Sequence, residues 1–340
     1  MWKQIVMTKV NTAELLDVPE KELKDNQVLV RTFVSTVSCG TEKANLTGDL
    51  NVSPDSKIPK EAKFPRYTGY SSSGIVESVG KDVKSVKVGD RVVMSWSHHC
   101  NYNVLDEKNI VKIEDERVTF EDGAIAHIGT FPMASLRKTK LEIGESMMVM
   151  GLGILGLLAV KFSKLAGAVP VIAVDPVKER RELALEYGAD YVFDPFEEGY
   201  AEKIKEITCG GVNCAIEVTG IGAGLNQTLD CMAKFGRVAL LGCTRDKNFT
   251  VDYYRKVHAP GITLIGAHTM ARPGQESHEG WFTQRDDIKT ILNLLKYKRI
   301  DLKGMVKETY NPEECTAVYE RLATDKNFPT VVQFDWRNVK

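Results

Sequence analysis

The middle of the chain alternates short apolar runs with segments whose apolar residues recur at helical spacing. The apolar runs, each of which predicts a strand, cover residues 146–150, 169–174, 190–193, 214–220, 236–243 and 262–268. The intervening segments 157–166, 178–185 and 200–208 predict helices. Continuous apolar strands are typical of sheets covered on both faces, so this alternation predicts a parallel sheet with right-handed crossovers.

The N-terminal region has a different pattern. Polar and apolar residues alternate over 2–7 and 27–34, which predicts strands, while 47–66 resembles a loop and 86–94 predicts a turn followed by a strand. After the parallel sheet, a helix over 286–295 and a closing strand over 331–336 are expected. We therefore expect an α/β protein with three segments: a β-rich domain over 1–128, a parallel-sheet domain over 129–268, and a return to the first domain over 269–340.

A glycine-rich turn follows the first strand of the predicted parallel sheet. It has the pattern Gly-x-Gly-x-x-Gly and consists of Gly151, Leu152, Gly153, Ile154, Leu155 and Gly156. In a dinucleotide site, Gly151 allows the tight turn, Gly153 lets the backbone approach a pyrophosphate, and Gly156 lets the helix pack on the strand. The helix N-terminus then offers free N–H groups to the phosphates.

The second strand of this sheet ends in Asp175, about 20 residues past the glycines. At that distance the dinucleotide fingerprint places the acid that holds the ribose 2′-hydroxyl, and a carboxylate there repels a 2′-phosphate. The sequence therefore predicts NAD as the cofactor, in preference to NADP. The alternative is an aspartate that only caps the turn at Asp175-Pro176.

Composition narrows the classes of function. The 340 residues carry 45 basic and 46 acidic side chains, a formal net charge of −1, which argues against a nucleic-acid partner or a polybasic membrane patch. No apolar run has the length of a spanning helix, and the N-terminus lacks a signal-peptide core. The seven cysteines are scattered without a Cys-x-x-Cys pair, so we expect reduced thiols and a cytoplasmic protein.

Four short motifs occur in a recognisable order. They are Cys39-Gly40-Thr41-Glu42, Gly69-Tyr70-Ser71, Gly74-Ile75-Val76 and Gly89-Asp90-Arg91-Val92. Together with the glycine-rich turn, they resemble the medium-chain dehydrogenase/reductases, the zinc-type alcohol dehydrogenase superfamily. The resemblance implies a Rossmann doubly wound parallel sheet inserted in a GroES-like β-rich catalytic domain. It also implies that coenzyme and substrate meet between the two domains.

The metal-binding positions of that family are changed here. Tyr70 and Ser71 occupy the places of the His and Glu of its Gly-His-Glu motif, and the later ligand position falls on His127. Cys39 and His127 are the two metal donors that remain, whereas zinc sites normally use at least three protein ligands, so a catalytic zinc is disfavoured. No structural zinc is expected, because the segment 93–111 holds one cysteine where the family uses four.

Without the metal, side chains must take the hydroxyl proton and stabilise the alkoxide. The candidates at the ligand positions are Cys39, Glu42, Tyr70 and His127. Each has a structural alternative: a buried thiol, a capping or paired carboxylate, a packed phenol and a core imidazole. One of His98 and His99 is a further candidate, since neighbouring side chains on an extended chain face opposite ways.

Further cofactor residues follow from the resemblance. They are Arg180, near the adenosine ribose, and the strand-end residues Thr219, Gly242, Cys243 and His268. The loop 270–285 places Trp281 near Arg272, Gln284 and Arg285, which suits a sugar or cyclitol. Its alternative is a surface loop.

These features favour a nicotinamide-dependent oxidoreductase that oxidises a secondary hydroxyl of a polyol, sugar, glycoside or cyclitol. Two alternatives are a zinc-free quinone or enone reductase and a non-catalytic NAD-sensing protein. The expected partner is a small-molecule substrate, with no nucleic acid and no membrane. The family habit of pairing a cofactor-domain strand across a two-fold axis predicts a homodimer or homotetramer.

Overall fold

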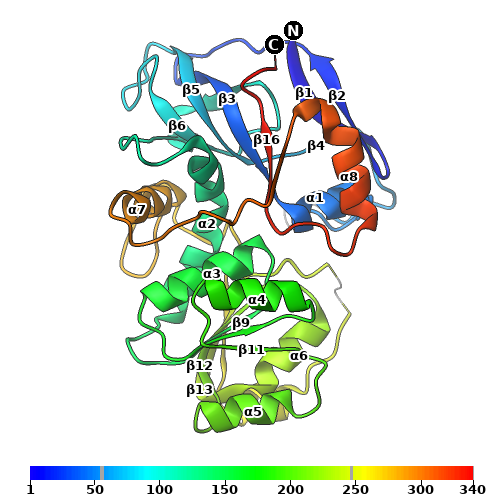
Figure 1. Ribbon diagram of the computed structural model, residues 1–340, viewed down its shortest axis with the longest axis vertical. Coiled ribbons are helices and arrows are strands. Elements are labelled where there is room, and N and C mark those ends of the chain that lie inside the picture. The colour runs from blue at the N-terminus through cyan, green and yellow to red at the C-terminus, as the bar shows by residue number, and fades with distance from the viewer. Residues whose placement is uncertain (54–56, 246–247, 340) are drawn as a thin grey trace. The chain divides into compact units, whose positions relative to one another are not determined.

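The computed structural model describes residues 1–53, 57–245 and 248–339, and it divides into two compact units (Figure 1). Unit 1 comprises residues 1–128 and 288–340, and unit 2 comprises residues 129–287. The loop 269–287, which we expected in the return segment, therefore clusters with the parallel sheet.

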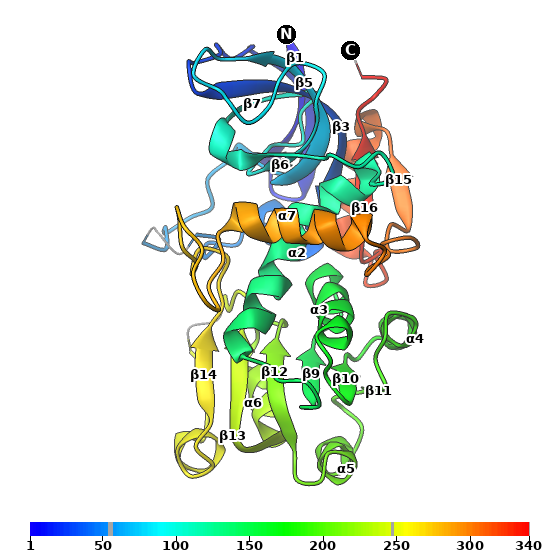
Figure 2. The same ribbon diagram turned by 90° about the vertical axis from the view of Figure 1, so that its left-hand side faces the viewer.

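Unit 2 is built on a six-stranded parallel sheet with the order β11-β10-β9-β12-β13-β14 (Figure 2). Its strands are β9 (Met147–Met150), β10 (Val171–Val174), β11 (Tyr191–Phe193), β12 (Val212–Glu217), β13 (Met232–Leu240) and β14 (Thr263–Gly266). In order of appearance the strands lie 3-2-1-4-5-6, the doubly wound order of dinucleotide-binding folds.

The helices of unit 2 connect these strands. They are α3 (Ile154–Leu165), α4 (Lys178–Glu186), α5 (Tyr200–Ile207), α6 (Gly222–Asp230) and the π-helical turn η2 (Tyr254–His258). Helices α5 and α6 pack with Met148, Ile172 and Ala215 in one hydrophobic core, while α3 contacts β9 and β10. All four residues of β9 are buried, as expected for a strand covered on both faces.

Unit 1 contains two sheets. The smaller has the order β2-β1-β4, and the larger has the order β15-β16-β3-β5-β6-β8, with β7 also paired to β3. The strands are β1 (Trp2–Lys9), β2 (Thr12–Val18), β3 (Gln27–Val37), β4 (Arg66–Tyr67), β5 (Ser71–Val79), β6 (Arg91–Ser95), β7 (Tyr102–Asp106), β8 (Ile110–Lys112), β15 (Glu308–Tyr310) and β16 (Val332–Asp335). Strand β16 pairs antiparallel with β3, so the end of the chain completes a sheet begun near its start.

The helices of unit 1 are α1 (Cys39–Leu46) and α8 (Cys315–Thr324), with short 3-10 turns η1 (Glu107–Asn109) and η3 (Pro312–Glu314). Helices α2 (Phe120–Thr139) and α7 (Gln284–Lys296) run from one unit into the other. One core joins Tyr319 of α8, Phe334 of β16 and Ile5 of β1. The predicted fold class, a doubly wound parallel sheet with a separate β-rich domain, is confirmed.

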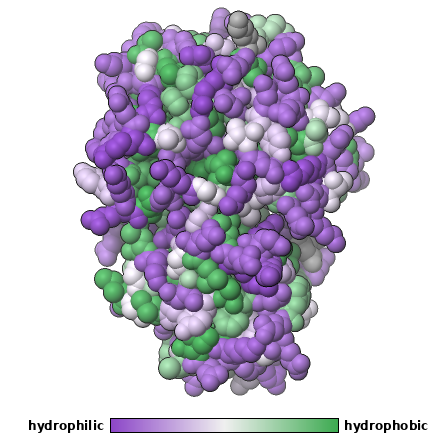
Figure 3. Space-filling model, in the orientation of Figure 1, coloured by the Kyte–Doolittle hydropathy of each residue, from purple (hydrophilic) through white to green (hydrophobic). Residues whose placement is uncertain are grey.

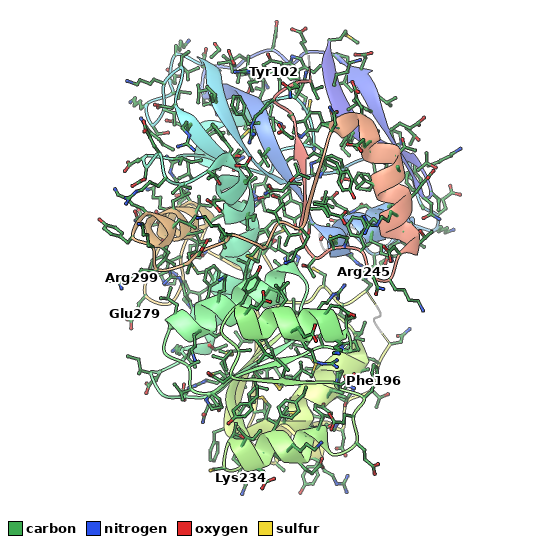
Figure 4. The ribbon with its side chains drawn as sticks, viewed as in Figure 1. Tyr102, Phe196, Lys234, Arg245, Glu279 and Arg299 are labelled. Carbon is green, nitrogen blue, oxygen red and sulfur yellow. The ribbon has the colours of Figure 1, made fainter. Side chains whose placement is uncertain are left out.

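The face seen in Figure 3 is mostly hydrophilic, with smaller apolar areas between the polar side chains. Among the side chains labelled in Figure 4, Phe196, which is 78% exposed, and the exposed Lys234 lie at the surface of unit 2. In the part of the chain that the structure describes, no helix combines the length and the apolar character needed to cross a membrane.

Candidate functional site

The glycine-rich turn of unit 2 has the backbone that a dinucleotide site requires. Gly151 has a φ of 97°, and its N–H donates to the carbonyl oxygen of Val174 at 2.8 Å. A Cβ on Gly156 would collide with the carbonyl oxygen of Gly151, whereas one on Gly153 would meet open space. Helix α3 begins at Ile154, three residues before the predicted start, so its N-terminus lies directly after Gly153.

Asp175 links this turn to the end of β10. Its Oδ2 accepts a hydrogen bond from Leu152 N–H at 2.7 Å, and its Oδ1 accepts one from Val177 N–H at 2.8 Å. The bond from Leu152 places the carboxylate beside the glycines. The bond from Val177 closes the local turn that was the alternative role of Asp175. Each oxygen keeps a further acceptor site. Arg180 lies 3.8 Å from Oδ2.

The loops after β12 and β13 meet beside the glycine-rich turn. A Cβ on Gly151 would lie 3.0 Å from Thr219 Cγ2, and one on Gly242 would collide with the backbone of Gly220. Glu217 accepts hydrogen bonds from the Thr219 and Gly220 N–H groups at 2.7 and 3.2 Å. Burial raises the pKa of Glu217 and outweighs these bonds. The structure thus brings Thr219, Gly242 and the exposed Cys243 close to the turn.

His268 follows β14 and is half-buried; its Nδ1 lies 3.3 Å from Met270 N. Its position is at the carboxyl end of the last strand of the sheet, the edge at which ligands bind in open parallel sheets.

In unit 1, Tyr70 and His127 lie together with Trp96. The ring centroids of Tyr70 and His127 are 5.5 Å apart, and those of Trp96 and His127 are 5.0 Å apart, both with edge-to-face geometry. The carbonyl oxygen of Tyr70 lies 2.6 Å from His127 Nδ1. The same oxygen accepts a hydrogen bond from the backbone N–H of Trp96 at 2.8 Å. Trp96 has a φ of 60°, an uncommon conformation for a bulky residue, and is 42% exposed.

Cys39 and Glu42 come from the first turn of α1 but have different surroundings. Cys39 is half-buried, with its Sγ 3.6 Å from the carbonyl oxygen of Pro329 and 3.8 Å from that of Thr330. Glu42 is 1% exposed, and both of its oxygens lie 3.2 Å from His99 Nε2.

A buried hydrogen-bond network surrounds Glu42. The Tyr319 hydroxyl donates to Oε2, and the Ser38 N–H donates to Oε1 at 2.8 Å. Burial acts to raise the pKa of Glu42, but His99 and the hydrogen bonds outweigh it and lower the pKa. Burial and the adjacent Glu42 hold the pKa of Tyr319 well above its ordinary value, which keeps this hydroxyl a donor.

Comparisons with known proteins agree with this geometry. Residues 24–140 match the alcohol dehydrogenase GroES-like domain, and residues 155–281 match the zinc-binding dehydrogenase domain. The chain belongs to the zinc-type alcohol dehydrogenase superfamily, the medium-chain dehydrogenase/reductases. It is therefore an alcohol dehydrogenase-like oxidoreductase that uses a nicotinamide dinucleotide.

Relatives in this superfamily align over most of the chain. L-threonine 3-dehydrogenase of Pyrococcus horikoshii is 27% identical over 332 residues, covering 88% of each chain. D-guloside 3-dehydrogenase of Escherichia coli is 24% identical over 306 residues, covering 83% of this chain and 85% of the relative. The crystal structure of galactitol-1-phosphate dehydrogenase from Escherichia coli has a TM-score of 0.84 at 18% identity, covering 98% and 99% of the two chains.

At two positions where the family resemblance implies zinc ligands, this chain has Tyr70 and Ser71. Among the described residues, no group of three or more histidine, cysteine, aspartate or glutamate side chains is arranged to hold a metal ion. Cys39 and His127 are the remaining candidates, and the carboxylate of Glu42 is engaged by His99, Tyr319 and Ser38.

Two neighbours of the candidate site in this dehydrogenase were not predicted from the sequence. Ser38 contacts the Tyr70 hydroxyl, and Trp96 lies beside Tyr70 and His127. A tryptophan directly after an apolar strand was the available signal for Trp96, whereas nothing in the sequence pairs Ser38 with Tyr70. Of the two histidines, His99 is buried beside Glu42, and His98 lies near Tyr67, with ring centroids 6.1 Å apart.

The loop expected to hold a sugar uses its polar groups internally. Trp281 lies over the Lys138 ammonium at 4.9 Å, and Arg272 donates to the Thr130 carbonyl oxygen at 2.9 Å and pairs with Asp287 at 3.4 Å. These contacts occupy Arg272 and Trp281 within this dehydrogenase, and the sugar site expected in this loop remains a prediction beside the alternative of a surface loop.

Proposed function

We propose that this protein catalyses the reversible, NAD-dependent oxidation of a secondary hydroxyl on a polyol, sugar, glycoside or cyclitol. We further propose that side chains handle the hydroxyl proton without a catalytic zinc. The relatives named for L-threonine and D-guloside support a hydroxyl-bearing substrate.

The preference for NAD is argued from Asp175. Its carboxylate lies beside the glycine-rich turn and is 3% exposed. A fixed negative charge at the adenosine ribose favours two free hydroxyls and repels a 2′-phosphate. The turn fits the cofactor because Gly151 adopts a positive φ and Gly153 leaves space above the start of α3.

The hydrogen bond between His127 and the Tyr70 carbonyl supports His127 as the group that accepts the hydroxyl proton of the substrate. A carbonyl oxygen only accepts, so Nδ1 of His127 must bear the hydrogen at 2.6 Å. In the neutral ring the lone pair then belongs to Nε2, which is the state of a general base. His127 is fully buried, so its ring orientation is fixed by packing as well as by this bond.

Bound NAD supplies the hydride acceptor. The substrate hydroxyl loses its proton to His127 Nε2 while the hydrogen on the same carbon leaves with its electron pair, and a ketone forms. The Tyr70 hydroxyl stabilises the negative charge that develops on the substrate oxygen.

The donor set does not fit a catalytic zinc. Tyr70 is not an imidazole, the Glu42 carboxylate is held by three other groups, and the Cys39 thiol packs against backbone carbonyl oxygens. Two donors, Cys39 and His127, are fewer than the three protein ligands that catalytic zinc sites use.

The exposed ring of Trp96 supports a ring-shaped substrate. Its centroid is 6.0 Å from that of Tyr70, and both rings contact His127 edge-to-face, so the three rings form one cluster. Sugars and cyclitols offer apolar CH faces that pack on aromatic rings, and their hydroxyls suit nearby polar groups.

The test is NADH formation by the purified protein with a panel of polyols, sugars, glycosides and cyclitols, before and after chelation, with elemental analysis for zinc. We expect chelator-resistant activity with NAD above NADP, and Asp175→Asn should narrow that preference about tenfold. Binding of NAD without turnover of any alcohol would indicate a non-catalytic NAD-binding protein. Stoichiometric zinc that is lost together with the activity would contradict the metal-free mechanism.

A further inference from the structure

The Tyr70 hydroxyl is held by Ser38. The distance from Tyr70 Oη to Ser38 Oγ is 2.5 Å, and Ser38 is 5% exposed. Ser38 is the N-cap residue of α1, yet its side chain makes no capping bond to the helix. The hydroxyl of this serine is therefore directed to the tyrosine, although serine at this position usually bonds to the N–H groups of its own helix.

The main chain of Ser38 is fixed by Glu42. The Ser38 N–H donates to Glu42 Oε1 at 2.8 Å, and the Ser38 carbonyl oxygen accepts the Glu42 N–H at 2.8 Å. As in a capping motif, the glutamate side chain accepts the backbone N–H of the N-cap serine. The serine hydroxyl is bonded to Tyr70 and not to the helix.

Glu42 is in turn fixed from other parts of unit 1. His99, from the loop after β6, lies 3.2 Å from both carboxylate oxygens, and Tyr319 of α8 donates to one of them. The other imidazole nitrogen of His99 lies 2.7 Å from Ser35 Oγ. Ser35 Oγ also accepts the Trp336 indole N–H at 2.8 Å. Buried polar networks of this kind fix side-chain positions when every member has a partner.

We propose that Ser38 is the positioning residue for the Tyr70 hydroxyl during alcohol oxidation, and that the buried Glu42–His99 pair fixes Ser38 for this task. This proposal rests on the proposed function. Ser38 acts through Tyr70. When the two hydroxyls rotate so that Ser38 donates to Tyr70 Oη, the phenol hydrogen is directed to the substrate oxygen and keeps a constant orientation. Small errors in such placement lower the rate of the chemical step more than they lower binding.

A double-mutant cycle tests the proposal. We expect Tyr70→Phe to lower kcat by about 10- to 100-fold and Ser38→Ala by about tenfold, with KM for the alcohol and the Kd of NAD within about twofold of the wild type. Because Ser38 acts through Tyr70, Ser38→Ala/Tyr70→Phe should be no slower than Tyr70→Phe alone. Ser38→Thr, which keeps the oxygen, should restore kcat to within about threefold.

The matched control is Ser72→Ala. Ser72 is also buried in unit 1, and its Oγ lies 2.5 Å from Ser97 Oγ, so this variant loses a comparable buried hydroxyl pair. Its kcat should stay near that of the wild type, and thermal melts show whether each variant is folded. Glu42→Gln should lower kcat in the wild type but not in the Tyr70→Phe background. If the glutamine variant does not fold, the serine variants alone test the positioning role.

The outcomes separate the two proposals. Effects of Ser38→Ala and Tyr70→Phe that multiply, or an unchanged kcat in Ser38→Ala, would overturn the positioning role while leaving the dehydrogenase activity in place. A wild-type protein that oxidises none of the alcohols would overturn the proposed function and the positioning role with it.

Discussion

Two neighbouring histidines after β6 lie in opposite environments. His99 faces Glu42 and Ser35, whereas His98 lies near Tyr67 and has its N–H bonded to Asn103 Oδ1 at 2.8 Å. Burial, followed by electrostatic repulsion from Lys21 and His99, lowers the pKa of His98 from 6.5 to about 4. His98 is therefore a group that folding keeps neutral at mildly acidic pH.

This shift predicts an acid-sensitive contribution to stability. Between pH 6.5 and about 4 the unfolded chain protonates His98 while the folded chain does not, so the free energy of unfolding falls as the pH falls through that window. The loss is at most about 3 kcal/mol. Thermal melts from pH 7 to pH 4 should therefore show a smaller decrease of Tm in His98→Gln than in the wild type, and parallel curves would contradict the assignment.

Individual residues could be predicted from the sequence where a motif has a fixed spacing. The positions of Gly151, Gly156 and Asp175 follow from the backbone needs of one turn, which local sequence determines. The Ser38–Tyr70 contact joins residues 32 positions apart, and the Glu42–Tyr319 contact joins residues 277 apart. Such pairs depend on how sheets and helices pack, and no local pattern encodes them.

Among the elements, the strands of unit 2 were the easiest to predict, because buried parallel strands are continuous apolar runs. Helices α1, α2 and α6 were not predicted. Helix α2 contains Pro132 and is largely buried, so it shows neither helix-favouring composition nor one polar face. Helix α1 is only eight residues long and begins at Cys39, within a segment that the sequence analysis treated as a ligand motif.

Two glycines of the turn between β9 and α3 should differ in how their substitution affects NAD affinity and thermal stability. Gly153 has a φ of −71° and open space at its Cβ position, so Gly153→Ala should fold normally but obstruct the approach of the pyrophosphate. Gly156→Ala should lower both Tm and NAD affinity, because its methyl group would collide with the Gly151 carbonyl oxygen.

Calorimetric NAD titration and thermal melts of the two variants check this. We expect a loss of affinity of about tenfold or more in both, with a lower Tm in Gly156→Ala alone. A Gly153→Ala variant that binds NAD like the wild type would contradict the prediction that the pyrophosphate binds at this turn.

For the whole molecule, we propose a homodimer in which β14 pairs with its copy. Strand β14 is the last strand of the sheet, and in the described part of the chain its pairing partner is β13 alone. Leu264, at its centre, is 39% exposed. An apolar edge strand with unpaired backbone groups favours pairing with a second chain.

Light scattering coupled to size exclusion tests the dimer. Leu264→Glu should shift the protein towards the monomer, because the two-fold axis would bring like charges together across the edge. Leu185→Glu on α4, at an equally exposed leucine of unit 2, is the control and should leave the mass unchanged. A wild-type protein that is monomeric at micromolar concentration would contradict the proposal.

The return of the chain to unit 1 has a consequence for synthesis on the ribosome. All of unit 2 precedes residue 288, whereas Tyr319 and Trp336, which hold Glu42 and Ser35, come later in the chain. The nucleotide-binding half can therefore fold while translation continues. The surroundings of Tyr70 are completed only once residues 319–336 have been synthesised, so a chain terminated before them can hold the cofactor fold without the proposed catalytic site.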